Sequence, residues 1–526
     1  MMQDLSTADA HQPRARVAPS NLDPNDFRAL GHDLVDRIAD FLARLPSLPV
    51  TPGEPPETVR ALLPAGGLPE QGAEPDALLA NAADILFAHS LINGHPRFFG
   101  YITSSPAPLG MLADLLAVAV NPNVGLFALA PIATEIESQA VRWIADLVGY
   151  PADCGGLFVS GGNMANFVGL LAARTSRAGW NVRSEGMAAG GGRLRIYASS
   201  ETHTWLQKTA DLCGFGTEAI SWIPADSLGR ITVDAVRECI ATDRAQGYLP
   251  FCVIGTAGAV ATGTVDPLLD LAALCHEQGL WFHVDGAYGG FAAGLAGDDQ
   301  GGIVPDDLRG LALADSVAID PHKWLYSPLE AGCVLVRRRD DLPATFSAHP
   351  TYYHLGEGAE SQPPVNYYEY GPQNSRGFRA LKVWLGLRHV GRSGVTRQIA
   401  DDIALAEAMA QRIASTHALQ LFTRQLSIVT FRYVPADLDL VSETSASDEY
   451  LNRLNTALLE RLQQSGEVFV SNAVLDGRFL LRACIVNFRT TVADIEALPE
   501  IVVRHGRAVD AALRSSLAQP PTGERA

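Results

Sequence analysis

The sequence contains few cysteines. Seven are scattered through 526 residues, and no two form a Cys-x-x-Cys pair. Several lie within apolar runs, which is typical of reduced core residues in a cytoplasmic protein. The distribution argues against a disulfide framework and against a metal site built on cysteine. A basic-then-apolar leader segment is not visible at the N-terminus either.

The chain also lacks an excess of positive charge and a long uninterrupted apolar run. Its formal net charge is −18, whereas nucleic acids and anionic membranes are bound by basic patches. The most apolar long stretch, Pro108–Pro131, is interrupted by Asp114 and by an Asn-Pro-Asn sequence, so it is not expected to span a membrane. We therefore expect neither a nucleic-acid partner nor a membrane.

What is present is a globular composition, with 47% hydrophobic and 19% charged residues, over a length that suggests two or three domains. Between residues 134 and 337, short apolar runs alternate with helical patterns, which predicts an α/β fold with a largely parallel, buried sheet. After residue 395, clustered strands with flanking helices favour a small α+β domain. The expected organisation is a tail (1–22), a helical segment that packs in a dimer (23–105), a large α/β domain (106–394), a small C-terminal domain (395–515) and a tail (516–526).

Near the N-terminus, apolar residues recur at helical spacing from Phe27 to Leu45, and Asp23 or Asn25 could cap that helix. No other long helix is expected nearby, because residues 46–75 are rich in proline and glycine and indicate an extended connection. The apolar face needs a partner, and a second subunit is one candidate. Farther along, helices are expected at 378–388 and 399–415 and a strand at 468–471.

The stretch from Asp315 to Trp324 carries the strongest chemical signal. An apolar strand ends at Asp320-Pro321, and His322 and Lys323 follow at its carboxyl end, where open α/β sheets place their ligands. A lysine beside a histidine against an apolar wall is suited to attack an aldehyde. We hypothesise that Lys323 holds pyridoxal phosphate as a Schiff base. The alternative is an ordinary surface lysine after a strand.

Three other positions could complete such a site. Asp285 ends an apolar strand, where a carboxylate is costly without a positive partner such as a pyridinium nitrogen, although it could simply cap a turn. The sequence Ser-Gly-Gly-Asn at 160–163 lies between a strand and a helix, where backbone N–H groups attract phosphate, but a tight turn explains it equally well. His203 follows a strand and could stack on a flat cofactor or be a plain loop residue.

Two aromatic stretches are also candidates. Residues 95–101, His-Pro-Arg-Phe-Phe-Gly-Tyr, suggest a pocket wall, with core packing of the two phenylalanines as the alternative. Tyr352 precedes a stretch rich in Gly, Glu, Ser and Pro that ends near Asn366, a composition typical of a mobile lid. A tyrosine on a lid could give a proton to a carbanion.

Taken together, these motifs resemble the pyridoxal-phosphate-dependent amino-acid decarboxylases of the group that includes aromatic-L-amino-acid, histidine and glutamate decarboxylases. The resemblance spans about residues 25–491 and keeps the order of the motifs. The most specific are His-Val-Asp-x-Ala-Tyr at 283–288 and Pro-His-Lys-Trp at 321–324. Tryptophan after the lysine resembles the aromatic branch, and residues 481–491 resemble the family's C-terminal signature.

The resemblance implies roles around the cofactor and an aspartate-aminotransferase-type large domain. Lys323 would bind the cofactor covalently, with His322 as its neighbour. Asp285 would pair with the pyridine nitrogen, His203 would stack on the ring, and Ala287 would pack near it.

It also implies roles at the phosphate and at the substrate. Gly162 and Asn163 would hold the phosphate. Tyr352 would protonate the substrate carbon after carbon dioxide leaves. Related aldehyde-forming enzymes typically have phenylalanine there, so tyrosine favours plain decarboxylation. The substrate pocket would be lined by Tyr101, Ile102 and Thr103, with residues 125–127 contributed by a partner subunit.

The sequence departs from the family pattern in three places. Residues 257–260 read Ala-Gly-Ala-Val where the family has Ala-Gly-Thr-Thr, so a hydroxyl near the cofactor is lost, and Thr256 or Thr262 could replace it. Asp320 stands where animal members usually have asparagine near the phosphate. The phosphate would repel the Asp320 carboxylate unless that carboxylate is protonated or turned away from it. Gly377 replaces the second arginine of the usual Arg-Arg-Phe-Arg.

The implied protein is a cytoplasmic homodimer with its active site at the subunit interface. It would convert an L-amino acid, with an aromatic one favoured, to the amine and carbon dioxide. No lysine or arginine of residues 101–103 and 125–127 is placed to take a side-chain carboxylate, and Ser375 aligns where plant tyrosine decarboxylases tend to have serine. The alternatives are a decarboxylase of glutamate or aspartate, an aldehyde-forming relative, and a catalytically idle regulatory homologue.

Overall fold

The structure, a computed structural model, describes residues 18–297, 302–348, 364–438 and 445–518. Its contacts divide the chain into two compact units. One comprises residues up to 48 together with 54–91, and the other comprises 49–53 and the chain from 92 onward. The boundaries predicted at 105/106 and 394/395 stay predictions.

The N-terminal unit is built on two long helices, α1 (Pro24–Arg44) and α3 (Pro75–His89). The carboxylate of Asp23 caps α1 by accepting the N–H of Asn25 at 2.8 Å. Phe41 and Phe87 stack with their ring centroids 4.4 Å apart, so α3 packs on α1. The expectation that no long helix lies near α1 in sequence is therefore wrong. α3 is rich in alanine and leucine on every side, so its sequence shows little amphipathic period, and α2 (Pro56–Ala61) interrupts the expected extended connection.

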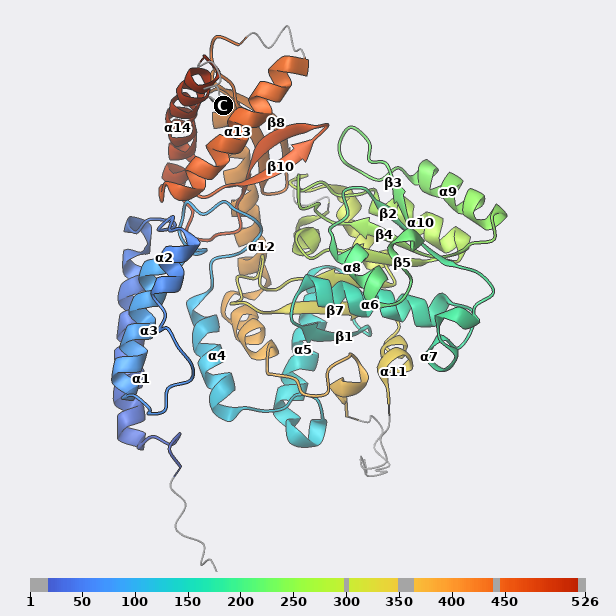
Figure 1. Cartoon of the computed structure of the whole chain (residues 1–526). Coiled ribbons are helices and arrows are strands. Elements are labelled where there is room, and N and C mark those ends of the chain that lie inside the picture. Colours follow the sequence, from blue (N-terminus) through green and yellow to red (C-terminus); the bar gives the residue numbers. More distant parts are fainter. Residues whose placement is uncertain (1–17, 298–301, 349–363, 439–444, 519–526) are drawn as a thin grey trace, which may run out of the picture. The chain divides into compact units, whose positions relative to one another are not determined.

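The second unit contains a seven-stranded sheet (Figure 1). Its strands are β1 (Gly155–Val159), β2 (Leu194–Ser199), β3 (Ile220–Ile223), β4 (Leu249–Thr256), β5 (Trp281–Asp285), β6 (Ser316–Ile319) and β7 (Gly332–Val336), in the order β1-β7-β6-β5-β4-β2-β3. The pairs from β3 through β6 are parallel, which confirms the predicted α/β class. β7 pairs antiparallel with both β1 and β6 and was not predicted, because its apolar run follows β6 without a helix between them.

Both faces of this sheet are buried, which explains the continuous apolar runs of its strands. Successive residues of β6 enter different cores, since Val317 and Ile319 belong to one cluster and Ala318 belongs to another. Helices that supply residues to these cores are α5 (Pro131–Leu147), which precedes β1, and α6 (Gly162–Arg177), α8 (Trp205–Leu212), α9 (Val233–Ala245) and α10 (Leu268–Gln278), which follow strands of the sheet. α6 packs across β1, β4, β5, β6 and β7, so its N-terminus lies beside the carboxyl ends of the central strands.

The C-terminal part is a four-stranded antiparallel sheet covered by two helices, as predicted for a small α+β region (Figure 1). The strands are β8 (Leu419–Gln425), β9 (Ile428–Tyr433), β10 (Ser471–Leu475) and β11 (Arg478–Cys484), and the helices are α13 (Ser445–Gln464) and α14 (Val492–Ala518). β10 begins where the predicted strand 468–471 ends. Thr491 precedes α14, and its N–H and hydroxyl donate to the Asp494 carboxylate at 3.0 and 2.7 Å.

A long helix, α12 (Ala380–Ala414), connects the two sheets. Two separate helices were predicted in this region. They form one element with a break at Gly391, whose φ of +66° lies in the left-handed region that glycine adopts without a Cβ clash. The shorter helix α4 (Pro108–Val120) packs against α12, and α11 (Asp341–Phe346) packs against α6. Among the helices that the structure describes, none combines the length and apolarity that crossing a bilayer requires.

Candidate active site

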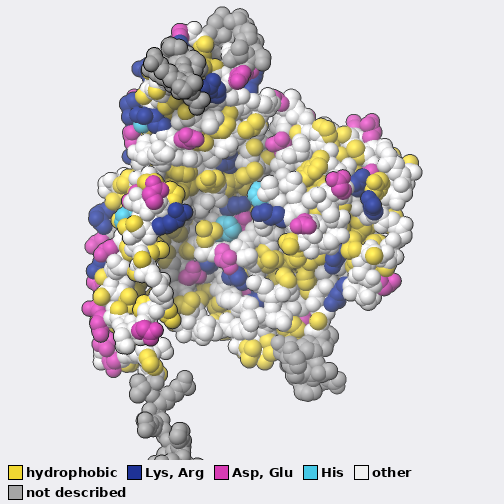
Figure 2. All heavy atoms as spheres, viewed as in Figure 1, with side chains coloured by type: hydrophobic (Ala, Val, Ile, Leu, Met, Phe, Trp, Pro, Cys, Tyr) yellow, Lys and Arg dark blue, Asp and Glu magenta, His cyan; other side chains and the backbone are white. Residues whose placement is uncertain are grey.

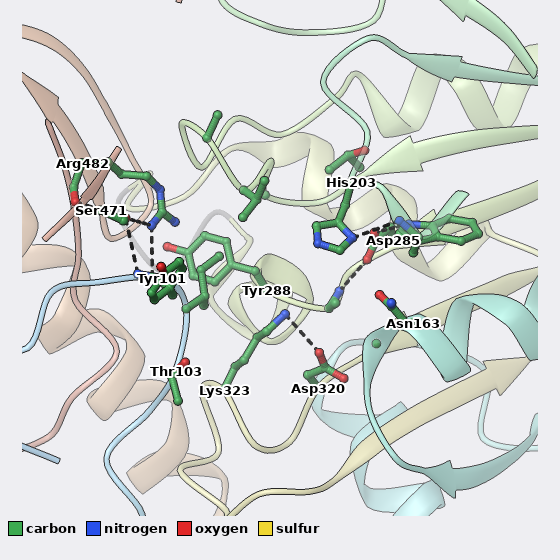
Figure 3. Close-up of a pocket in the computed structure, with 18 of the residues that line it drawn as sticks. Tyr101, Thr103, Asn163, His203, Asp285, Tyr288, Asp320, Lys323, Ser471 and Arg482 are labelled. Atoms are coloured by element: carbon green, nitrogen blue, oxygen red, sulfur yellow. Dashed lines mark hydrogen bonds and ion pairs between the residues drawn. The ribbon is translucent and has the colours of Figure 1, made fainter. Parts of the chain in front are cut away.

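Lys323 lies in a turn directly after β6. Its N–H donates to the Asp320 carbonyl at 2.9 Å, and its own carbonyl accepts the N–H of Tyr326 at 3.0 Å. The Lys323 Nζ lies 3.0 Å from Asp320 Oδ2, and this carboxylate is only 2% exposed (Figure 3). The lysine was predicted to lie against an apolar wall. On the side of Asp320, a buried carboxylate that points toward the Lys323 ammonium takes the place of that wall.

His322 lies on the other side of the same carboxylate. Its Nδ1 hydrogen-bonds the Ala331 carbonyl at 2.7 Å, and its Nε2 is 3.6 Å from Asp320 Oδ2. Burial lowers the pKa of the His322 imidazole, an effect that the charge of Asp320 partly offsets. The backbone carbonyl of His322 accepts the Ser104 hydroxyl at 2.7 Å, which fastens the turn to the segment before α4.

Asp285 ends β5, next to β6, so its side chain reaches the same space as Lys323. Oδ2 accepts the indole N–H of Trp205 at 2.7 Å, and Oδ1 accepts the N–H of Ala287 at 3.1 Å. The His203 ring lies beside Asp285 (Figure 3). Burial lowers the pKa of the His203 imidazole, an effect that the charge of Asp285 partly offsets. The flat ring is therefore uncharged at neutral pH.

The glycine turn between β1 and α6 forms another wall. Gly162 opens α6, and a Cβ built on it would lie 2.8 Å from Asp320 Oδ2 and 3.1 Å from the Ala287 Cβ. Only glycine fits this approach. Asn163 follows it and also lines the pocket, so the free N–H groups of a helix start lie where an anion can be held.

The histidine of the His-Val-Asp motif, His283, is not among the described residues that line this space. His283 is fully buried, with Nδ1 2.7 Å from the Ser316 hydroxyl and Nε2 2.7 Å from Asn166 Oδ1. Burial lowers its pKa to about 4, so it is neutral. It ties α6, β5 and β6 together beneath the pocket and thereby positions Asp285.

These residues surround a cavity of about 560 Å³. The space-filling view shows histidine and basic side chains inside a hollow on the face drawn (Figure 2). Tyr101, Ile102 and Thr103, which are predicted to line a substrate pocket, lie along this cavity, and β10 contributes residues 471–474. Residues 125–127 and Ser375 are not among its lining residues in the described chain. Tyr352 lies outside the described residues.

Arg482 of β11 is the lining residue that sequence reasoning missed. It is 2% exposed, and its Nη1 donates to the Tyr101 carbonyl and to the Ser471 hydroxyl, both at 3.1 Å (Figure 3). Its Nε and Nη2 are buried and have no hydrogen-bond partner among the described residues. An arginine inside the apolar strand Leu-Leu-Arg-Ala-Cys was the available signal, because a buried cation needs a partner.

The altered stretch at 257–260 also borders the cavity. Thr256, Gly258 and Val260 line it, whereas the Thr262 hydroxyl is 2.7 Å from the Thr264 hydroxyl and is therefore already engaged. Of the two threonines that could replace the missing hydroxyl, only Thr256 lines the cavity.

The donor set fits pyridoxal phosphate. One cavity is lined by the Lys323 amine, by the Asp285 carboxylate that could pair with a ring nitrogen, and by the flat imidazole of His203. The start of α6 lines it too, and the missing Cβ of Gly162 leaves room there. One feature opposes the fit. Asp320 Oδ1 is buried without a hydrogen-bond partner among the described residues, and it lies beside the expected phosphate position. The N–H groups at the start of α6 offset this negative charge.

Comparisons with known proteins agree with this chemistry. The family described as "Pyridoxal-dependent decarboxylase conserved domain" matches residues 56–434. An aromatic-L-amino-acid decarboxylase of Bacillus atrophaeus is 33% identical over 90% of this chain and 94% of its own. A phenylacetaldehyde synthase of a Rosa hybrid cultivar is 27% identical over 95% of this chain and 98% of its own. The crystal structure of Oryza sativa TDC with PLP and tryptamine superimposes with a TM-score of 0.83 at 25% identity, covering 94% of this chain and 99% of the other.

The family match covers well over half of the chain, and the bacterial relative covers nearly all of it. The chain belongs to the pyridoxal-dependent decarboxylase family, as a carboxy-lyase acting on an amino acid with pyridoxal phosphate as its cofactor.

Proposed function

We propose that this chain converts an aromatic L-amino acid to the corresponding amine and carbon dioxide. The observation that carries the proposal is that Lys323, Asp285 and His203, which are far apart in sequence, line one cavity. The names of the bacterial decarboxylase and the rice structure support an aromatic substrate. Ile102, Val260 and the ring of Tyr101 supply apolar wall for a large side chain.

The predicted residues that line the cavity are assigned roles around the cofactor. When bound, pyridoxal phosphate supplies a carbonyl for covalent attachment and a ring that accepts electrons from the substrate carbon. Lys323 holds the cofactor through Nζ, with His322 beside it. Asp285 keeps the ring nitrogen protonated, and His203 presents its flat, neutral face to the ring, near Ala287.

The phosphate end is assigned to the start of α6. Gly162 and Asn163 offer backbone N–H groups there, and the absence of a Cβ on Gly162 permits close approach. We assign the proton that replaces carbon dioxide to Tyr352. That assignment rests on the sequence resemblance.

Arg482 suggests which group of the substrate the protein binds. Arg482 lines the cavity, and its Nε and Nη2 are buried without a hydrogen-bond partner among the described residues, so a carboxylate of the substrate is the partner that we assign to it. For an aromatic amino acid, this is the α-carboxylate. The same observation favours a second candidate, an amino acid with an acidic side chain, and the two candidates differ in which carboxylate Arg482 binds.

The first test is an absorbance spectrum of the purified chain with pyridoxal phosphate, followed by borohydride and peptide mapping. We expect a band near about 420 nm that borohydride abolishes, with the label on Lys323. Lys323→Ala is expected to lose the covalent cofactor and nearly all activity. Normal turnover by that variant would refute the assignment.

Carbon dioxide release is then measured with tyrosine, tryptophan, phenylalanine, DOPA, glutamate and aspartate. Preference for any of the first four supports the proposal, and preference for the last two supports the acidic alternative. Turnover of none of them would favour the idle regulatory homologue.

The product distinguishes decarboxylation from the aldehyde-forming reaction of relatives such as the rose enzyme. We expect the amine from the unaltered chain. Tyr352→Phe should yield less amine and more aldehyde, because the proton donor is lost and dioxygen can then oxidise the substrate carbon, with release of ammonia and hydrogen peroxide. An unchanged product ratio would remove Tyr352 from the mechanism.

We also propose a homodimer whose active site includes residues 125–127 of the partner chain. An exposed apolar row on α4 supports this, since Leu112, Leu115 and Leu116 are each more than half exposed. All seven cysteines are free thiols, which supports the proposal that the protein is located in the reducing cytoplasm.

A further inference from the structure

A buried carboxylate outside the pocket is bonded to the turn that carries Lys323. Asp402 lies on α12 and is 2% exposed. Its Oδ2 accepts the indole N–H of Trp324 at 3.0 Å and the hydroxyl of Tyr326 at 2.6 Å. Trp324 and Tyr326 are the first and third residues after Lys323. Asp402 Oδ2 therefore holds the side chains of both Trp324 and Tyr326, at the end of the turn that carries Lys323.

The turn needs such a restraint. Tyr326 has a φ of +52°, a left-handed conformation that a bulky residue adopts only when its surroundings enforce it. The carbonyl of the same residue accepts the N–H of Ala107 at 2.8 Å, at the start of α4. Releasing the Tyr326 side chain would free both the strained backbone and the pocket segment that is bonded to it.

Asp402 also joins the turn to the C-terminal part of the chain. The backbone N–H of Asn487, which follows β11, favours the charged form of Asp402 and partly offsets the rise in its pKa, and the Tyr326 ring meets Phe488 edge to face, with ring centroids 5.2 Å apart. The Trp324 ring stacks on Tyr288, which lines the pocket, and the Tyr288 hydroxyl is 2.7 Å from that of Ser427 at the start of β9. The lysine turn and the C-terminal sheet are thus connected on two sides, and Asp402 is common to the contacts of Trp324 and Tyr326.

The known reaction does not use Asp402 directly. It does not line the cavity, and its hydrogen bonds come from neutral donors. Asp401 is the charged neighbour that adds repulsion, and burial raises the pKa of Asp402 to about 7. Keeping a carboxylate at such a buried place is costly, which argues for a positional task.

We infer that Asp402 is the positioning residue that holds the turn of residues 320–326 against the C-terminal part of the chain, so that Lys323 reaches the cofactor from a fixed backbone. This inference rests on the proposed role of Lys323. Asp402 touches neither cofactor nor substrate and acts through Trp324 and Tyr326.

The test compares Asp402→Asn, Tyr326→Phe and the matched control Asp401→Asn, whose side chain is on the exposed face of the same helix. For each full-length variant, the dissociation constant of pyridoxal phosphate, the fraction of Lys323 labelled by borohydride, and kcat and KM are measured at a temperature where circular dichroism shows the native fold. Tyr326→Phe removes one hydroxyl and keeps the ring, so it remains informative if Asp402→Asn does not fold.

We expect Asp402→Asn to weaken cofactor binding about tenfold, since it removes the charge of the acceptor, and Tyr326→Phe about threefold, since it removes one hydrogen bond. In both, kcat should fall while KM stays unchanged, because the substrate wall at Tyr101 and Arg482 is intact. The double variant should be no worse than Asp402→Asn alone, and Asp401→Asn should match the unaltered chain.

Cofactor affinity, labelling and kcat that stay unchanged in both Asp402→Asn and Tyr326→Phe would overturn the inference, even if thermal stability falls. Failure of the unaltered chain to label Lys323 would instead refute the proposed function, and the inference with it. The two failures are therefore distinguishable.

Discussion

Arg482 shows how a single buried residue can decide substrate binding. Arg482→Gln should raise KM for every amino acid about ten- to a hundredfold if it binds the α-carboxylate, since a hydrogen bond to a charged group is lost. If it binds a side-chain carboxylate, only glutamate and aspartate turnover should suffer. The measurement is kcat and KM across the substrate panel. Arg424→Gln, on strand β8 of the same sheet and paired with Glu407, is the matched control. Unchanged KM values throughout would show that Arg482 holds no carboxylate.

Asp402 should make stability depend on pH with a defined sign. Its pKa is raised from 3.8 to about 7 by burial, so the folded chain binds this proton more tightly than the unfolded chain does. The stabilisation is fully present below the unfolded value and is lost as pH rises through about 7. Thermal unfolding at pH 5 and pH 8 should therefore show the unaltered chain losing stability relative to Asp402→Asn at the higher pH. Asp266 and other groups that titrate in the same range are present in both chains, so the difference between the two chains isolates Asp402.

For single residues, the sequence predicted best those functional side chains that lie at the ends of strands. Asp285 and Lys323 terminate or follow apolar runs, and adjacent parallel strands bring such residues together. Arg482 and Asp402 were not singled out, because their importance depends on which buried groups they meet. The Trp324 and Tyr326 donors reach Asp402 across 76 or more residues of sequence. No local pattern encodes that distance.

The start of α6 is the element most sensitive to a small change. In Gly162→Ala, the new methyl group would overlap Asp320 Oδ2, which must shift and weaken its ion pair with Lys323. We expect pyridoxal phosphate to bind about tenfold more weakly or worse, measured by absorbance titration. Gly386→Ala lies on α12 with nothing within 4 Å of the added Cβ, so it should bind normally. Equal affinity in the two variants would show that this turn does not approach the cofactor.

Elements with clear periodicity were predictable, and those defined by their neighbours were not. The alternation of apolar runs and helical patterns between residues 134 and 337 predicted the parallel part of the large sheet, and the helical spacing from Phe27 to Leu45 predicted α1. The pairing of α3 with α1 was missed, because α3 is apolar all around. β7 was missed because only its position between β1 and β6 makes it a central strand. The union of two predicted helices into α12 depends on the conformation of Gly391, which sequence alone does not fix.

For the whole molecule, the exposed face of α4 leads to a prediction about assembly. Leu112, Leu115 and Leu116 are each 53–54% exposed, and Val118 and Val120 are 69–70% exposed. An exposed apolar row of this kind favours association, and residues 125–127, assigned to a partner's site, follow the same helix. Leu116→Glu should place a charge in that contact and disrupt the dimer.

Light scattering after gel filtration should give twice the 56.1 kDa chain mass for the unaltered protein and the single mass for Leu116→Glu. Activity should fall with the dimer, because each site would lose residues 125–127 of its partner. Leu212→Glu, at a 77% exposed position on α8, is the matched control and should leave mass and activity unchanged. A fully active monomer would separate the active site from the subunit interface, and an unaltered chain that is itself a monomer would refute the dimer.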